Sequence, residues 1–162
     1  MPSNSPQRAP GNFAWIAYNP KDGLFYSSKS DNADRLYQYA ISGQIVYIGS
    51  VALTKVMQKV AGGAFSKNGR LYLASNDPAT GAVNVVDLDP SHRNVGVVLG
   101  VGHLTWDPDD GEEIEGITVV DLDDGRAPNI RGQIHVIMFQ NEIHSNDDFY
   151  FKHMRVSPLD KL

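Results

Sequence analysis

A tandem repeat is the feature of this sequence that most constrains its fold. The segment IAYNPKDGLFYSS (16–28) aligns with GAFSKNGRLYLAS (63–75), and the same offset carries RLYQYAIS (35–42) onto AVNVVDLD (82–89). A looser third copy begins at EGITVVDLDDG (115–125). The matched residues of the first two copies, 47 apart, are Ala17/Ala64, Leu24/Leu71 and Ser28/Ser75. Self-similarity at a fixed period predicts that one structural unit recurs along the chain.

Each copy has the pattern of several short β-strands. Runs of β-branched and aromatic residues alternate with turn clusters such as Lys67-Asn68-Gly69 and Asp123-Asp124-Gly125. Helical periodicity is confined to ALTKVMQKVA (52–61), where Val56 and Val60 weaken it. We predict strands near residues 13–19, 23–29, 35–41, 44–51, 60–66, 70–75, 82–88, 95–102, 114–120, 133–140 and 148–156.

A repeat of roughly 40–50 residues with about four short strands and no helix is typical of a β-propeller blade. A β-sandwich with accidental similarity is the alternative, and the shared offset across two strand pairs favours the propeller. The predicted fold is therefore all-β, a partial propeller of about three four-stranded blades. Its expected divisions are a disordered leader (1–12), blades at about 13–53, 56–104 and 112–157, and a tail (158–162).

Three blades are too few to close a ring, since propellers have about four to eight. The sequence therefore predicts either a piece of a longer propeller or two copies that associate. An open blade flank exposes apolar surface and unpaired edges, which promotes association. The expected partner is a second copy of the chain or a second propeller half.

Composition excludes several function classes. The net charge of −5 and the lack of a long basic run argue against a nucleic-acid partner. No apolar stretch is long enough to span a membrane. The absence of cysteine excludes disulfides and thiolate metal sites, but it does not identify a compartment. The leader MPSNSPQRAPGN lacks the apolar core of a signal peptide, so localisation stays undetermined.

Several segments resemble known propellers. GGAFSKNGRLYLAS, EEIEGITV, IHVIMFQNE and DFYFKHMRV look like the C-terminal half of uncharacterised bacterial β-propellers, over about residues 13–156. More distantly they are similar to gluconolactonase/regucalcin-like and phytase-like propellers. The resemblance to the regucalcin-like enzymes implies a metal that polarises a lactone carbonyl. No complete catalytic motif of either enzyme family is present.

Propeller topology predicts where a ligand would bind. The start of the first strand of each blade and the loop after the second strand share one face, at the mouth of the central channel. On this face we expect a site for a ligand, with Trp106 beside it as a stacking surface. The other predicted ligand-binding residues are Asn76, Asp77, Asn141, Glu142 and His144.

Glu113 and Glu115 lie two residues apart at a strand start and would share one side of it. Two carboxylates with amide oxygens nearby suit a hard cation such as calcium. The alternative is that Glu113 ends a solvated acidic turn and only Glu115 faces inward. The sequence thus predicts a binding or scaffold module with an acidic ligand face. The second hypothesis is a calcium-type, metal-dependent hydrolase in which these two glutamates are the ligands.

Overall fold

The computed structural model describes residues 13–102, 104–107, 109, 111–122, 126–127, 129–140 and 148–156. The predicted leader and tail therefore lie outside the described residues. The described part is built from β-strands, with one short 3₁₀ turn, η1 (Pro90–His92). The all-β prediction is confirmed.

The strands form three consecutive antiparallel groups, which we call blades 1, 2 and 3. Blade 1 contains β1 (Ala17–Tyr18), β2 (Phe25–Ser27), β3 (Ala33–Ile41) and β4 (Ile45–Met57). Blade 2 contains β5 (Val60–Phe65), β6 (Leu71–Ser75), β7 (Val83–Asp87) and β8 (Val95–Gly102). Blade 3 contains β9 (Glu112–Asp121), β10 (Gly132–Gln140) and β11 (Asp148–Val156).

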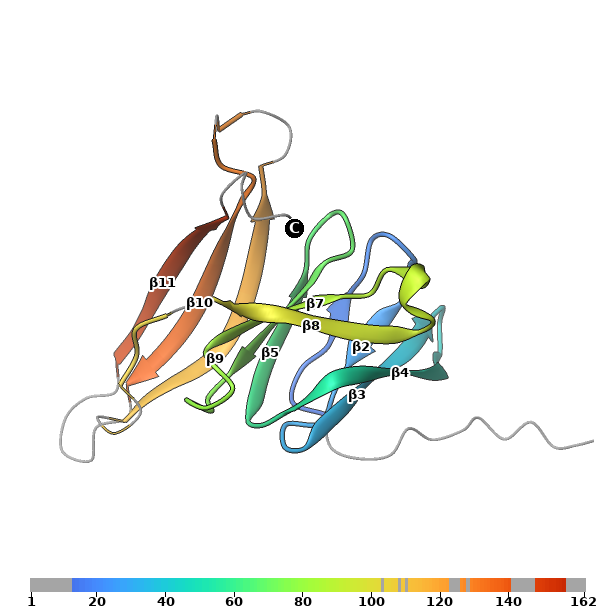
Figure 1. The fold of residues 1–162 in the computed structure, drawn as a ribbon, viewed down its shortest axis with the longest axis horizontal. Helices are drawn as coiled ribbons and strands as arrows, with labels where there is room; N and C mark the ends of the chain where they lie inside the picture. The colour runs from blue at the N-terminus through green and yellow to red at the C-terminus, as the bar shows by residue number, and fades with distance from the viewer. Residues whose placement is uncertain are drawn as a thin grey trace, which may run out of the picture.

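Blades 1 and 2 join at their outer strands. A short parallel contact pairs Ala52 with Val95 and Leu53 with Gly96, which makes one eight-stranded sheet in the order β1-β2-β3-β4-β8-β7-β6-β5. Blade 3 is a separate sheet in the order β11-β10-β9. Figure 1 shows blade 3 at one side, β2–β4 at the other and β5 between them. The first strand of blade 2, β5, contacts the first strands of both neighbours, β1 and β9. This arrangement is a partial β-propeller, as predicted.

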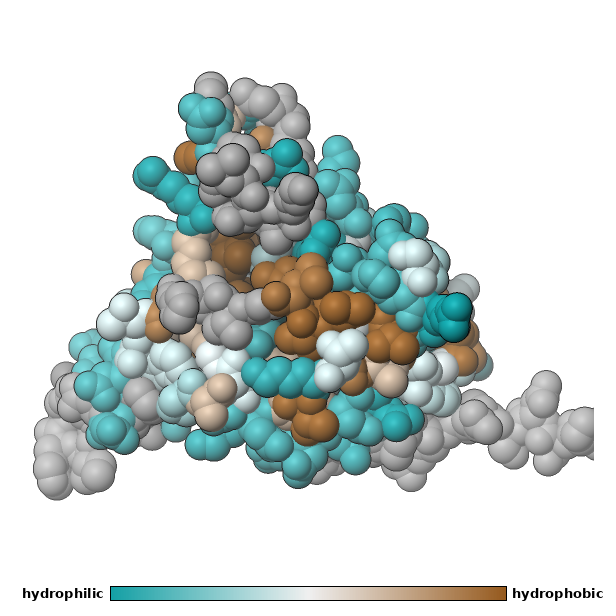
Figure 2. Space-filling model, viewed as in Figure 1, coloured by the Kyte–Doolittle hydropathy of each residue, from teal (hydrophilic) through white to brown (hydrophobic). Residues whose placement is uncertain are grey.

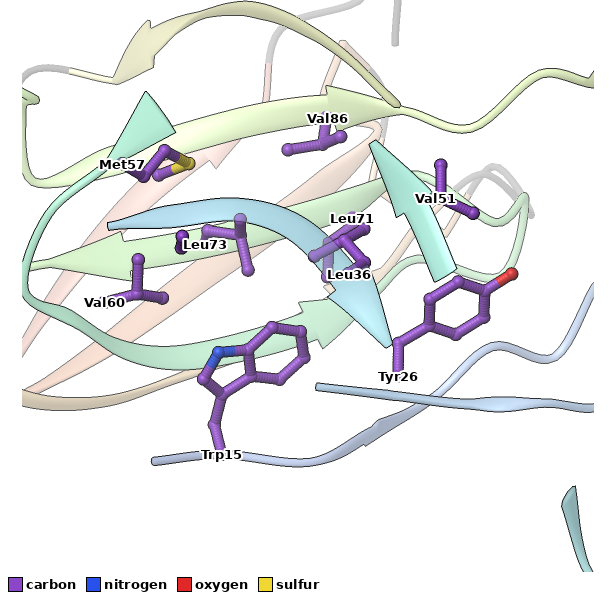
Figure 3. Packing of buried hydrophobic residues seen from close by; sticks show 10 residues of the cluster. Trp15, Tyr26, Leu36, Val51, Met57, Val60, Leu71, Leu73 and Val86 are labelled. Atoms are coloured by element: carbon purple, nitrogen blue, oxygen red, sulfur yellow. The ribbon is translucent and has the colours of Figure 1, made fainter. Parts of the chain in front are cut away.

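The first hydrophobic core lies between blades 1 and 2 (Figure 3). Tyr26 and Leu36 from blade 1 pack against Leu71, Leu73 and Val86 from blade 2. Leu36, Leu71 and Leu73 are fully buried, and burial of each such side chain contributes about 1.5–3 kcal/mol.

The second core lies between blades 2 and 3. Tyr72 and Val83 from blade 2 pack with Ile114, Val136 and Met138 from blade 3. Because side chains alternate along a strand, β6 sends Leu71 and Leu73 into the first core and Tyr72 into the second. Each blade thus has a leading face, directed at the preceding blade, and a trailing face, directed at the following one.

The repeat register is correct in part. Ala17 pairs with Tyr26 in blade 1, and Ala64 pairs with Tyr72 in blade 2. Ala17 and Ala64 are 47 residues apart, but their partners Tyr26 and Tyr72 are only 46 apart. The predicted pairs Leu24/Leu71 and Ser28/Ser75 are therefore wrong by one residue. The cause is the turn between the first two strands, which is one residue shorter in blade 2.

The outer surface carries apolar side chains. Figure 2 shows a hydrophobic area in the region where Figure 1 places β4 and β8. Val56 on β4 and Leu99 on β8 are each half-exposed. Within the described residues, no helix has the length and apolar character that a membrane span requires.

Candidate functional site

A cavity of about 600 Å³ opens where β5 and β9 begin, beside the loops that follow β2 and β6. These are the chain segments that propeller topology predicts to share one face. We call this space the mouth cavity. Its lining residues are Ala14, Ser30, Asp31, Lys59, Val60, Ala61, Asn76, Glu112, Glu113, Ile114 and Glu115.

Three of the predicted site residues, Asn76, Glu113 and Glu115, line the mouth cavity together. Both glutamates are exposed, and they flank the fully buried Ile114 on β9. The strand therefore anchors itself through Ile114 and holds the two carboxylates at the opening.

Asn76 fixes the position of β9. Its Nδ2 donates a hydrogen bond to the Ile114 carbonyl oxygen at 2.9 Å, and its Oδ1 accepts one from the Ile114 N–H at 2.5 Å. One side-chain amide thus replaces a backbone partner and ties the loop after β6 to the next blade. Asn76 is a positioning residue for Glu113 and Glu115, and its oxygen is already engaged.

Hydrogen bonds also join blade 1 to blade 2, between the loop after β2 and the start of β5. The Val60 N–H donates to the Ser30 carbonyl oxygen at 2.9 Å. The side chain of Gln58 accepts from the Asn32 N–H and donates to the Asn32 Oδ1, both at 3.0 Å. Lys59 follows with a positive φ of 48° and adds a cation to the lining. The rim of the mouth cavity is therefore held by hydrogen bonds between successive blades.

Glu112 was not predicted as a site residue, and it is the most constrained carboxylate of the cavity. It accepts hydrogen bonds from the Tyr150 hydroxyl and, at 2.6 Å, from the Asp107 N–H, and its Oε2 lies 3.3 Å from the Lys152 Nζ. Burial opposes ionisation, but these hydrogen bonds and the ammonium charge lower the pKa of Glu112 below its usual value. Burial and the Glu112 carboxylate raise the pKa of Tyr150 to about 12. No local sequence signal reveals this network, because β10 separates β9 from β11.

Of the other predicted ligand-binding residues, Asp77 and Trp106 do not line the mouth cavity. The Asp77 carboxylate accepts hydrogen bonds from Thr80 and from the Ala79 N–H within its own turn. The hydrogen bond from Thr80 lowers the Asp77 pKa. Trp106 is half-buried and packs against the second core. Asn141, Glu142 and His144 lie outside the described residues.

The predicted calcium site would need several oxygen ligands around Glu113 and Glu115. Calcium takes six to eight oxygen ligands. Among the residues that the structure describes, no three or more histidine, aspartate or glutamate side chains are grouped to hold a metal ion. Glu112 is held by Tyr150 and Lys152, and the Asn76 oxygen by Ile114. Calcium binding and the hydrolase hypothesis stay predictions.

A second cavity of about 640 Å³ lies between the loops of blades 1 and 2, around the β1–β2 and β5–β6 turns. Its charges are balanced, and Arg70 already lies 3.8 Å from the Asp87 carboxylate. The mouth cavity, with its excess of carboxylates, is the better candidate site. The charged residues of the second cavity are Lys21, Asp22, Lys67, Arg70, Asp87 and Asp89.

Comparison with known proteins supports a repeat architecture. The profile of a family described as "Repeat of unknown function (DUF6923)" matches residues 3–99. No curated protein matches the chain. Neither the family description nor the structural match below names a gluconolactonase, a regucalcin or a phytase, so that distant similarity stays a prediction.

A solved structure shares the fold. It is the crystal structure of a protein from Lactobacillus plantarum, from the Northeast Structural Genomics Consortium, with a TM-score of 0.50 and 14% sequence identity. The match covers 95% of this chain and 45% of the other. This chain therefore spans less than half the length of that protein.

Proposed function

The chain belongs to the DUF6923 family of repeats of unknown function, and from this premise we propose that it is a propeller-type binding and scaffold module. It associates with a second copy of itself through the two open blade flanks, and it presents the mouth cavity as its ligand face. The argument for association comes from how its own blades pack.

The two internal cores follow one packing rule. The trailing face of blade 1 covers the leading face of blade 2, and the trailing face of blade 2 covers the leading face of blade 3. The leading face of blade 1 and the trailing face of blade 3 have no such cover within the described residues. Those two faces are the open flanks.

The open flank of blade 3 carries the observation on which the proposal depends. Phe149 and Phe151 on β11 are 69% and 63% exposed, and they stand opposite Phe139 and Ile137 on β10. The rings of Phe139 and Phe149 are in contact, with centroids 4.8 Å apart and an interplanar angle of 36°. Contiguous exposed aromatic surface of this kind marks an interaction site in a folded protein. Burial of each phenylalanine would contribute about 1.5–3 kcal/mol.

The open flank of blade 1 is aromatic as well: Tyr37 and Tyr39 are buried within it, and Tyr18 is 51% exposed. Phe13, Tyr37, Tyr39 and Tyr47 form a chain of ring contacts with centroids 5.1–6.4 Å apart. The Tyr39 hydroxyl is buried and has no hydrogen-bond partner in the described residues. Burial and the neighbouring tyrosines raise the Tyr39 pKa to about 12.

Comparison of equivalent residues in blades 1 and 2 indicates which surface would cover the open flank of blade 1. In blade 1, Tyr39 lies opposite Phe25. The equivalent pair in blade 2 is Val86 opposite Leu71. These two residues pack against the trailing face of blade 1. A trailing face is therefore the expected partner of the tyrosine flank. Two copies joined head to tail, each blade 3 on the other's blade 1, would give about six blades, within the range of closed propellers. The 45% coverage of the Lactobacillus plantarum protein supports a complete unit larger than three blades.

The mouth cavity supports a ligand with a cationic group. Asp31, Glu113 and Glu115 contribute carboxylates to its lining, against the single ammonium of Lys59. Association of two copies would bring a second set of these residues to the same channel. Calcium is the simplest probe: a rise in melting temperature with calcium that is lost in Glu113→Gln supports cation binding here.

Sedimentation velocity of the untagged chain tests the association. We expect a species of twice the 17.8 kDa chain mass, and we expect Phe149→Lys to convert it to a monomer, because a lysine would have to be desolvated at the contact. Leu99→Lys on β8 is the matched control, since Leu99 is also half-exposed but lies on neither flank. A wild-type chain that stays monomeric at all concentrations contradicts the proposal. A monomer that becomes stable only with a separate propeller chain identifies the second half as the partner instead.

A further inference from the structure

Two histidines stand side by side on the open flank of blade 3. His135 on β10 lies directly opposite His153 on β11, and the ring centroids are 5.5 Å apart at an interplanar angle of 66°. His153 is exposed and His135 is half-buried, so both rings can be reached from solvent. They are 18 residues apart in the sequence, and only the hairpin register brings them together.

The spacing of the rings suits a shared metal ion. A Zn²⁺–imidazole bond is about 2.0–2.1 Å long, and a ring centre lies about 1 Å beyond its nitrogen. Two imidazoles on one tetrahedral ion therefore have ring centres roughly 5 Å apart. The observed 5.5 Å is close to this separation, so a small rotation of the side chains brings both nitrogens onto one ion.

The side-chain amide of Gln133 orients the His135 ring. The His135 Nε2 lies 3.2 Å from the Gln133 Oε1. Because an amide oxygen only accepts hydrogen bonds, the Nε2 carries the proton and the Nδ1 keeps its lone pair. Metal-binding histidines commonly donate their other N–H to such an oxygen, which fixes the tautomer and raises the basicity of the ligand nitrogen.

We propose that His135 and His153 form a two-nitrogen chelate for a divalent transition metal of the Cu²⁺, Ni²⁺ or Zn²⁺ class. Imidazole nitrogen suits these ions, whereas calcium and magnesium require oxygen ligands. The other positions on this face present no carboxylate beside the pair: Thr118 lies opposite His135 on β9, and Arg155 lies opposite Gln133. Water fills the remaining coordination positions of the ion.

Calorimetric titration of the untagged chain with copper chloride and with nickel chloride tests the chelate. We expect one ion per chain, with tighter binding of Cu²⁺ than of Ni²⁺. His135→Gln and His153→Gln should each weaken binding at least tenfold, because one imidazole cannot chelate. His92→Gln removes a histidine on η1, outside blade 3, and should leave the affinity unchanged. Equal affinity in the wild type and in both pair variants, or no saturable binding by the monomeric Phe149→Lys chain, overturns the proposal.

A protonation readout separates chelation from a change in folding. Both pair variants should keep the wild-type circular dichroism spectrum, because glutamine is tolerated at exposed strand positions. Binding by the wild type should weaken from about pH 8 to about pH 5.5, since protons compete for the imidazole nitrogens. A chelate whose affinity is independent of pH in this range contradicts histidine ligation.

The histidine pair lies on the flank that the proposed association covers, so the monomeric variant is the decisive sample for the chelate. Phe149→Lys, designed to disrupt the flank contact, leaves both histidines in place and should still bind one Cu²⁺ per chain. A monomeric wild type that binds the ion removes the proposed association and leaves the chelate. If the wild type is a dimer that binds no ion, Phe149→Lys decides the case: a monomer that also binds no Cu²⁺ removes the chelate and leaves the association.

Discussion

At the scale of single residues, Asn76 links the stability of the fold to the geometry of the mouth cavity. Its amide satisfies both backbone polar groups of the buried Ile114. Asn76→Ala leaves those groups without their partners, so we expect a loss of about 1–3 kcal/mol in the free energy of unfolding. Urea denaturation measures this loss. Gln44→Ala, at an exposed amide in the β3–β4 turn, is the control and should change stability by less than about 0.5 kcal/mol. Equal effects of the two substitutions would rule out the anchoring role of Asn76.

Glu112 gives the chain an acid-sensitive contact. Its pKa is lowered in the folded state, so its ionised form stabilises the fold above the unfolded-state pKa. That contribution is lost as the pH falls below about 4.3, the ordinary value for glutamate, and through the lower folded-state pKa. Glu112→Gln should therefore have a lower melting temperature than the wild type at pH 7, and the two should converge in acid. A difference that stays constant from neutral to acidic pH would contradict this assignment.

At the scale of strands, β5 can lie close to its neighbours because it has a glycine pair, Gly62-Gly63, in its middle. A Cβ at Gly63 would lie 2.5 Å from the Trp15 ring, and one at Gly62 would lie 3.1 Å from the Gly116 Cα of β9. The Trp15 indole is itself held by a 2.9 Å hydrogen bond to Ser28. Side chains at these glycines would push the first strands of successive blades apart.

Gly63→Ala should therefore cost about 1–3 kcal/mol, the typical effect of overpacking a core. It should also shift the fluorescence of Trp15, because the ring has to move. Gly49→Ala on β4 is the matched control, since a Cβ there meets only the Gln38 Oε1 at 3.7 Å. Urea denaturation followed by tryptophan fluorescence compares the two variants. A Gly63→Ala protein with wild-type stability and spectrum would show that β1 and β5 are not closely packed.

The strands themselves could be predicted from the sequence. All eleven predicted strands are present, because alternating apolar runs bounded by Gly, Asn and Asp turns are strong local signals. The one segment with helical periodicity, residues 52–61, belongs to β4 and β5, where Val56 and Val60 favour a strand. The register of the repeat was harder to predict, because sequence similarity does not show that the turn ending at Gly69 is one residue shorter.

The site could be predicted only where topology alone fixes it. Asn76, Glu113 and Glu115 line one cavity, because strand starts and loops of successive blades share a face. The contact between Glu112 and Tyr150 crosses an intervening strand, and the opposition of His135 and His153 depends on the hairpin register. Neither follows from sequence spacing, because long-range register is set by packing and turn length rather than by local pattern.

At the scale of the whole molecule, head-to-tail association couples folding to concentration. If the open flanks are covered only in the dimer, mass action stabilises the folded chain as its concentration rises. We expect the melting temperature to increase with the logarithm of protein concentration for the wild type and for Leu99→Lys. The melting temperature of Phe149→Lys should be independent of concentration, because this variant has lost the contact.

A substitution on the other flank distinguishes the head-to-tail arrangement from a symmetric contact between two blade 3 flanks. Tyr18 on β1 is 51% exposed and lies on the same face as Phe25 and Tyr39. In the head-to-tail dimer this face meets the partner's blade 3, so Tyr18→Lys should abolish the concentration dependence as Phe149→Lys does. In a symmetric contact between blade 3 flanks, Tyr18 is far from the interface and its substitution has no effect on association. Scanning calorimetry at several concentrations of the two variants therefore decides between a ring of about six blades and a pair of half-propellers joined through one sheet.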